Sequence, residues 1–175
     1  PANLALDPDG TAKTNEQGQA IFTATTTVAA KYTLTAQVSQ TNGQVSTKTA
    51  ESKFVADDKN AELTASSDVQ SLVADGKSTA KLEVTLFSAN NPVGGNVWVD
   101  IEAPEGVTEK DYQFLPSKND HFVSGKITRT FSTSKPGVYT FTFNALTYGG
   151  YEMKPVTVTI TAVDADTAKG EEAMK

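Results

Sequence analysis

Hydrophobic and polar residues alternate along most of this chain. From Ala80 to Leu86 every second residue is apolar, and Lys81, Glu83 and Thr85 fill the positions between. A period of two places the apolar side chains on one face of a β-strand and leaves the other face to water. The same alternation recurs at positions 20–24, 32–38, 97–101, 139–143 and 156–162. The chain is therefore predicted to consist of strands with one buried face.

Turn-forming residues separate these stretches. The clearest pairs are Asp9-Gly10, Asn42-Gly43, Asp75-Gly76, Pro136-Gly137 and Gly149-Gly150. Turns at this spacing, without a convincing helical run, predict an all-β fold built as an antiparallel β-sandwich. Only the segment 108–119 has mixed periodicity, and it is predicted to be a long loop with at most one helical turn.

Two segments of the chain have the same layout. One runs from Asn15 through a strand to a second strand opened by Tyr32, and the other runs from Ser124 through a strand to one opened by Tyr139. In both, threonines alternate with other residues after the tyrosine. The separation of roughly a hundred residues is the size of one immunoglobulin-like (Ig-like) sandwich. We therefore predict tandem Ig-like β-sandwiches.

The register of this repeat sets the predicted domain boundaries. Tyr139 follows most of a complete Ig-like domain at 58–163, whereas the matching Tyr32 stands near the start of the chain. Residues 1–57 are therefore predicted to be the C-terminal half of an Ig-like domain whose N-terminal half is missing. Residues 164–175 have the composition of a polar C-terminal tail.

A half-domain of this kind needs a partner. Four strands are too few to close two sheets, so Phe22, Tyr32 and Leu34 are expected to be covered by strands from outside residues 1–175. The expected partner is the complementary N-terminal half of the first Ig-like domain, held noncovalently as a companion chain cleaved just before Pro1. The alternative is a symmetry-related copy that exchanges strands.

Composition removes most classes of enzyme. The 175 residues include no cysteine and one histidine, His121, which excludes disulfides, thiolate zinc sites, cysteine nucleophiles and multi-histidine metal sites. No glycine-rich phosphate loop follows a predicted strand. The formal net charge of -6 disfavours nucleic acid and anionic lipid as partners. The chain is therefore predicted to be non-catalytic, without cofactor or metal, and without membrane contact of its own.

The candidate chemical residues are sparse. His121 is predicted to be a solvated histidine at a strand edge, because catalysis needs a nucleophile and an orienting group that the sequence does not place beside it. The segment 7–10 lacks the ligand spacing of an EF-hand and is predicted to be a structural turn. A cation clamp between modules is a weaker alternative for the linker carboxylates Asp57, Asp58 and Glu62.

The only tryptophan, Trp98, is the main candidate for ligand binding. It stands between Val97 and Val99, so strict alternation points the indole away from the sandwich core. The segment 108–119, which carries Tyr112 and Phe114, is expected to cover it. If Trp98 is uncovered, these three aromatic residues form a possible ligand-binding patch.

Several motifs resemble one bacterial family. Thr14-Asn-Glu-Gln-Gly-Gln-Ala-Ile-Phe-Thr-Ala-Thr, Lys31-Tyr-Thr-Leu-Thr-Ala, Phe54-Val-Ala-Asp-Asp and Leu72-Val-Ala-Asp-Gly-Lys-Ser-Thr-Ala-Lys-Leu-Glu-Val-Thr-Leu are similar to the bacterial Ig-like modules of the intimin and invasin family. The resemblance covers about residues 12–163. It implies an outer-membrane adhesin of a Gram-negative bacterium, whose N-terminal β-barrel exports a rod of Ig-like domains. Nothing here resembles the disulfide-bearing lectin-like domain that ends intimin and invasin, so their receptor binding is not carried over.

Two functions follow from these expectations. The first is a non-catalytic extracellular segment of a bacterial surface adhesin, in which Ig-like stalk or tip modules mediate or present adhesion to a host cell-surface or matrix receptor. Its implied location is the bacterial surface, anchored through an upstream barrel. The alternative is a carbohydrate-binding or spacer Ig-like module of a secreted glycan-active enzyme, where Trp98 would stack on sugar.

Overall fold

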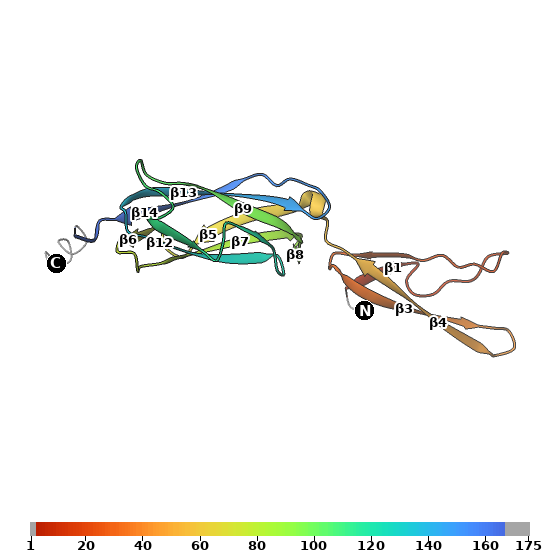
Figure 1. Cartoon of the computed structure of the whole chain (residues 1–175). Helices are drawn as coiled ribbons and strands as arrows, with labels where there is room; N and C mark the ends of the chain where they lie inside the picture. The colour runs from red at the N-terminus through yellow and green to blue at the C-terminus, as the bar shows by residue number, and fades with distance from the viewer. Residues whose placement is uncertain (1–2, 167–175) are drawn as a thin grey trace. The chain divides into compact units, whose positions relative to one another are not determined.

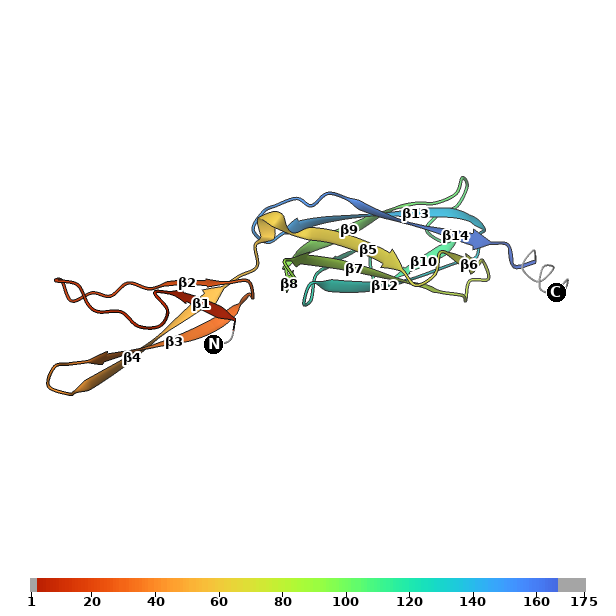
Figure 2. The same cartoon turned by 180° about the vertical axis from the view of Figure 1, so that it is seen from behind.

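A computed structural model describes residues 3–166 and divides the chain into two compact units (Figures 1 and 2). The first unit contains the residues up to Ala56 together with Ala89–Asn91, and the second contains Asp57–Ser88 together with the residues from Pro92 onward. One turn of 3-10 helix, η1 (Asp58–Asn60), follows the boundary. The other elements that lie wholly within residues 3–166 are β-strands, which confirms the predicted all-β class.

The first unit holds two separate pairs of strands. β1 (Leu4–Asp7) pairs antiparallel with β2 (Thr23–Thr26), and β3 (Ala30–Ser39) pairs antiparallel with β4 (Val45–Phe54). The β3–β4 hairpin turns at Gly43, whose φ of 86° lies in the left-handed region that glycine tolerates. Within the described residues neither pair is joined by a further strand, so each is a two-stranded sheet with open edges.

The second unit is a β-sandwich of two sheets. The first sheet has the order β10-β12-β7-β5, with a short strand β8 paired to β7. Its strands are β5 (Glu62–Ser67), β7 (Ala80–Ser88), β8 (Asn91–Pro92), β10 (Tyr112–Leu115) and β12 (Lys126–Thr133). All of its pairings along the main path are antiparallel.

The second sheet has the order β11-β9-β13-β14-β6. Its strands are β6 (Ser71–Val73), β9 (Gly95–Glu102), β11 (Asn119–His121), β13 (Gly137–Thr147) and β14 (Val156–Val163). β6 pairs parallel with β14 and the others pair antiparallel. The chain from β5 to β6 therefore crosses from one sheet to the other, as the first strand of many Ig-like sandwiches does.

The alternating apolar residues meet between these sheets. On β7, Leu82, Val84 and Leu86 are fully buried, and on β13 the rings of Tyr139 and Phe141 are fully buried too. The Phe131 ring lies 4.9 Å from both the Tyr139 and Phe141 rings, measured between centroids. The period of two in the sequence thus becomes one continuous aliphatic and aromatic core.

A hydrogen-bonded tyrosine corner fixes the start of β13. The Tyr139 hydroxyl donates to the carbonyl of Lys135 at 2.8 Å and lies 2.7 Å from the Thr133 hydroxyl. The Thr133 hydroxyl donates to the carbonyl of Asp111 and accepts from the amide of Lys135. A tyrosine that bonds back to the chain at this corner is a hallmark of Ig-like sandwiches.

The same corner occurs in the first unit. The Tyr32 hydroxyl donates to the carbonyl of Val28 at 2.9 Å and lies 3.1 Å from the Thr26 hydroxyl. The Thr26 hydroxyl donates to the carbonyl of Asn3 and accepts from the amide of Val28. All four contacts match those of Tyr139, so the two copies share their local geometry as well as their sequence layout.

The predicted loop at 108–119 is wrong. This segment contains β10, which pairs with β12 so that Phe114 lies opposite Phe131, and β11 begins at its end. β10 is only four residues long and is followed at once by Pro116. A strand this short carries too few alternations for periodicity to reveal it.

The strand expected to begin at position 20 is also shorter than the alternating apolar pattern predicts. Ala20 and Phe22 continue the alternation of Ala24, yet β2 begins only at Thr23. A strand is held by its neighbours, and among residues 3–166 β2 pairs with β1 alone, which ends at Asp7 opposite Thr23. The apolar pattern therefore extends beyond the backbone pairing that the first unit supplies.

Candidate functional site

Trp98 lies on the outer face of the second sheet. β9 alternates buried Val97 and Val99 with outward-facing positions, and Trp98 is one of the latter, half-buried. Its cross-strand neighbours are Asn119 on β11 and Asn144 on β13. The indole thus lies in a polar setting on a broad sheet face, as the alternation predicts.

Tyr112 and Phe114 do not lie beside Trp98. Both are on β10, in the opposite sheet, and both face the core. The Phe114 side chain is 9% exposed and its ring stacks on Phe141 at 5.6 Å, while Tyr112 packs edge-on against Tyr139 at 5.9 Å. The predicted cover of Trp98 by these two residues is therefore wrong, because β10 belongs to the sandwich. A ligand-binding role of Trp98 stays a prediction.

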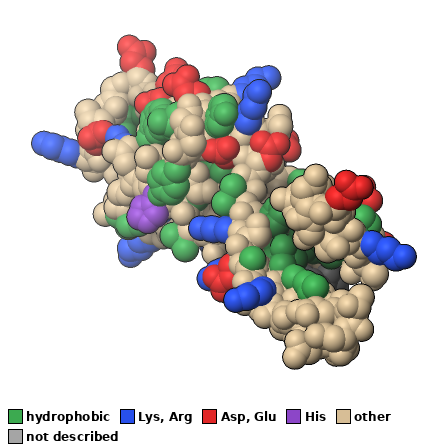
Figure 3. Space-filling model, turned by 90° about the vertical axis from the view of Figure 1, so that its right-hand side faces the viewer, with side chains coloured by type: hydrophobic (Ala, Val, Ile, Leu, Met, Phe, Trp, Pro, Cys, Tyr) green, Lys and Arg blue, Asp and Glu red, His purple; other side chains and the backbone are tan. Residues whose placement is uncertain are grey.

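His121 occupies a strand edge. It ends β11, the outermost strand of its sheet, and its side chain is 61% exposed, which confirms the predicted solvated histidine. The histidine is visible at the surface in Figure 3. Its Nδ1 lies 3.5 Å from Oδ1 of Asp120. The carboxylate is itself engaged by an arginine, so it is not free to orient the imidazole.

That arginine, Arg129, is a buried charge that the sequence analysis did not single out. It follows Ile127 by two positions on the inward phase of β12 and is only 4% exposed. Its guanidinium donates to Asp120 Oδ2 at 2.5 Å and to the carbonyls of Ser117 and Thr128 at 2.8 Å. The bond to Asp120 joins β12 of one sheet to β11 of the other. An arginine in the apolar phase of a strand was the available signal.

The ion pair also sets the titration of the carboxylate. The Arg129 guanidinium holds the pKa of Asp120 below its usual value, and the backbone amide of His121, which donates to Asp120, acts in the same direction. Asp120 therefore stays ionised through the neutral range. A carboxylate committed in this way is a structural anion rather than a general base.

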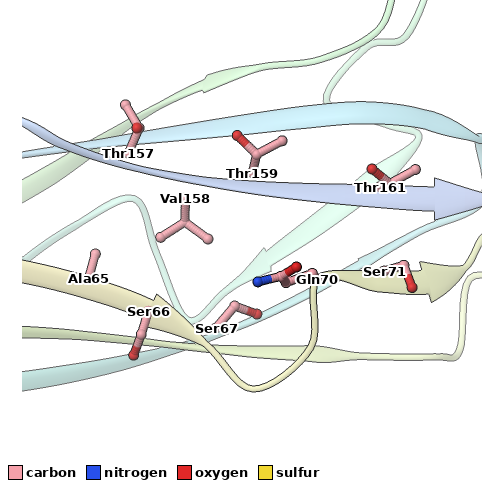
Figure 4. Close-up of a pocket in the computed structure, with 9 residues that line it drawn as sticks. All are labelled: Ala65, Ser66, Ser67, Gln70, Ser71, Thr157, Val158, Thr159 and Thr161. Atoms are coloured by element: carbon pink, nitrogen blue, oxygen red, sulfur yellow. The ribbon is translucent and has the colours of Figure 1, made fainter.

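A groove of about 780 Å³ follows β5 and β14 (Figure 4). Ala65 and Val158 point into the space between the two strands, whereas Thr157, Thr159 and Thr161 point away from it. The lining is completed by Ser66, Ser67, Gln70 and Ser71. None of these side chains is titratable, so the groove offers hydroxyl and amide groups but no acid, base or nucleophile activated by a neighbouring base.

The first unit presents a different kind of surface. Hydrophobic side chains line a hollow in this unit (Figure 3). Ile21 is 75% exposed, Phe22 40% and Val38 50%, and only Tyr32 among the predicted core positions is buried, at 6%. Tyr32 packs edge-on against Phe54 with ring centroids 5.5 Å apart. This uncovered apolar surface, bordered by open strand edges, is the clearest candidate for interaction in the described chain.

Two classes of feature are absent from residues 3–166. No group of three or more His, Asp or Glu residues there is arranged to hold a metal ion. Nor does that part of the chain contain a helix of the length and apolarity needed to cross a membrane.

No family model matches the chain, and no curated protein matches it. Several solved structures are similar at low identity. The D00-D0 domain of intimin is 16% identical, covering 92% of this chain and 78% of its own, with a TM-score of 0.48. Invasin, described as a bacterial integrin-binding protein, is 21% identical, covering 92% of this chain and 31% of its own, with a TM-score of 0.41.

An enzyme is similar to the same degree. A glycosyl hydrolase family 2 member from Bacteroides cellulosilyticus is 17% identical, with a TM-score of 0.45. The match covers 82% of this chain but only 18% of that protein.

Proposed function

We propose that this chain is a non-catalytic extracellular segment of a bacterial surface adhesin, in which Ig-like modules form a stalk and present or mediate adhesion. The observation that carries the proposal is the recurrence of one tyrosine corner, at Tyr32 and again at Tyr139, with the same four contacts. Serial repetition of one module is how an extended rod is built, because each module adds length without new chemistry.

The surface chemistry supports the same proposal. The histidine is exposed, the buried arginine is paired, and the groove along β5 and β14 carries only hydroxyl, amide and apolar groups. The motifs that resemble intimin and invasin modules run through both units. The proposed location is the outer surface of a Gram-negative bacterium, and the proposed partner is a host cell-surface or matrix receptor.

Surface display and adherence test this proposal together. Antibody fragments raised against residues 57–166 should label intact cells of the organism that makes the protein, and should reduce adherence of those cells to host cells. Labelling only after permeabilisation contradicts the proposal. Intact labelling without any loss of adherence restricts the modules to the stalk.

One observation favours the carbohydrate-binding alternative. Trp98 is a half-buried aromatic residue on the outer face of a sheet, flanked by Asn119 and Asn144, and aromatic faces of this kind can stack on sugars. A glycan array with Trp98→Ala as the variant separates the two functions. Polysaccharide binding that is lost in Trp98→Ala favours a module of a glycan-active enzyme, and no Trp98-dependent binding favours the adhesin.

A further inference from the structure

The strands of the first unit correspond one by one to the last strands of the second. β1 matches β10, β2 matches the second half of β12, β3 matches β13 and β4 matches β14. The pairing registers agree, because Leu4 lies opposite Thr26 as Tyr112 lies opposite Thr133, and Tyr32 lies opposite Ser52 as Tyr139 lies opposite Ile160. Nothing in residues 3–56 corresponds to β5, β6, β7 or β9.

The second unit shows what lies against the equivalent edges. β7 pairs antiparallel with β12, and places Leu82 opposite Arg129. β9 pairs antiparallel with β13, and places Val97 opposite Ala145. β6 pairs parallel with β14. In the first unit no strand of the described chain pairs with the edges of β2, β3 and β4 that would receive these strands.

Two irregular segments of the first unit mark where the strands are missing. Residues 127–129 of β12 pair with β7 and not with β10, and their counterparts 20–22 are not a strand. β11 pairs only with β9, and its counterpart near residues 11–14 is not a strand either. The parts of the second unit that pair with β7 or β9 alone therefore have no strand at the matching positions of the first unit. The strands that also pair with β10 or β14 do have a matching strand there.

Side-chain exposure follows the same division. Val38 is 50% exposed, whereas Ala145 at the matching position is 2% exposed. Phe22 is 40% exposed, whereas Arg129 at the matching position is 4% exposed. Tyr32 does not follow this division. It is only 6% exposed, because the Phe54 ring and its own hydrogen-bonded corner pack around it. The expectation that Tyr32 needs strands from outside residues 1–175 to cover it is therefore wrong.

We propose that residues 3–56 are the acceptor half of an Ig-like sandwich, completed by one further stretch of polypeptide that adds a strand to β2, a strand to β3 and a parallel strand to β4. The donor is a polypeptide with the strand pattern of residues 62–102. Its β7-like strand presents alternating small and aliphatic residues, and its register places an apolar side chain against Phe22. This is strand addition at open sheet edges, with main-chain hydrogen bonds along each edge and side-chain pockets between the sheets. The proposal is independent of the adhesin function.

A second copy of this chain is not the donor. Residues 3–166 contain two sets of the last four strands but one set of the first four, β5, β6, β7 and β9. A copy that donated its own first set would expose the core formed by Leu82, Phe131 and Tyr139 in its second unit. Exchange between copies would therefore complete the first unit of one copy only by leaving the second unit of the other copy incomplete, so the number of open sheet edges would not fall.

The probe that tests this is the chain's own first set of strands. Because Asn3 takes the place of Asp111 at the tyrosine corner, residue 108 is the counterpart of the position just before Pro1. We extend the full chain at its N-terminus with a second copy of residues 57–108. The matched control carries Leu82→Lys and Val84→Lys in the added copy only, which preserves length and loops but places charge on the inward face.

Hydrogen exchange and molecular mass are measured for the unmodified, extended and control chains. The extended chain should be monomeric, and exchange of the amides at 19–39 should slow by roughly tenfold or more relative to both other chains. Unchanged exchange in a folded extended chain overturns the proposal. If the extended chain does not fold, hydrogen exchange of the unmodified chain tests the proposal instead. Its 19–39 amides should exchange much faster than those at 126–146, whereas equal protection, as monomer or as dimer, overturns the proposal.

Discussion

Removing one hydroxyl from the tyrosine corner tests the structural basis of the repeat. Tyr139 is fully buried, and its hydroxyl bonds to the Lys135 carbonyl at 2.8 Å and lies 2.7 Å from the Thr133 hydroxyl. Tyr139→Phe keeps the ring and its contact with Phe131 but removes the donor. A buried polar group left without its partner costs about 1–3 kcal/mol, so we expect the second unit to lose about that much unfolding free energy.

Urea denaturation followed by circular dichroism measures this change. With a slope of about 2 kcal/mol per molar urea, the midpoint of the second unit should fall by roughly 0.5–1.5 M. Tyr148→Phe is the matched control, because Tyr148 is 66% exposed. Its effect should stay within about 0.5 kcal/mol. The reasoning is refuted if Tyr139→Phe unfolds at the wild-type midpoint, or if Tyr148→Phe costs as much.

Three further outcomes are expected. Leu82→Ala empties a fully buried site on β7 and should lower the unfolding free energy by about 2–5 kcal/mol. Lys81→Ala, on the exposed face of the same strand, should change the unfolding free energy by less than about 0.5 kcal/mol. An effect of Leu82→Ala as small as that of the control contradicts the assigned core. Arg129 lowers the pKa of Asp120 in the folded state, so the ionised Asp120 stabilises the fold at pH values above the carboxyl pKa of the unfolded chain. This contribution to the unfolding free energy is lost as the pH falls through the folded pKa. Asp120→Asn should therefore make the unfolding free energy less dependent on pH in the acid range. EDTA should leave the thermal midpoint unchanged, and a drop of many degrees revives a cation site in the linker.

The sequence alone was sufficient to predict the class of fold and the repeat. Alternation at Leu82 and Phe141 is a direct consequence of strands with one buried face, so it can be read without coordinates. The matching of Tyr32 with Tyr139 was visible in the sequence, because the bond from each tyrosine hydroxyl to a backbone carbonyl is local and joins residues four positions apart.

The rest depended on which strands lie side by side. β10 was missed because four residues hold too little periodicity, and with it the placement of Tyr112 and Phe114 in the core. The pairing of Arg129 with Asp120 joins two sheets and is not encoded by any spacing between the two residues. Phe22 continues the alternating pattern of β2, but no strand among residues 3–166 pairs with its backbone, so it lies outside β2. Local periodicity reports which face of a strand is apolar, but only tertiary pairing decides what covers it.

Disulfide trapping tests the central claim, that the first unit is an acceptor in the register of the second. The chain has no cysteine, so any cross-link is unambiguous. In the second unit Leu82 lies opposite Arg129, whose counterpart is Phe22. In the extended chain, Phe22→Cys with Leu82→Cys in the added copy should therefore oxidise to an internal disulfide, since directly opposed residues approach to about 4.5–5.5 Å between Cβ atoms. Phe22→Cys with Glu83→Cys in the added copy should not, because a shift of one residue turns the side chain to the other face. Equal cross-linking of both pairs, or of neither in a folded monomer, contradicts the account.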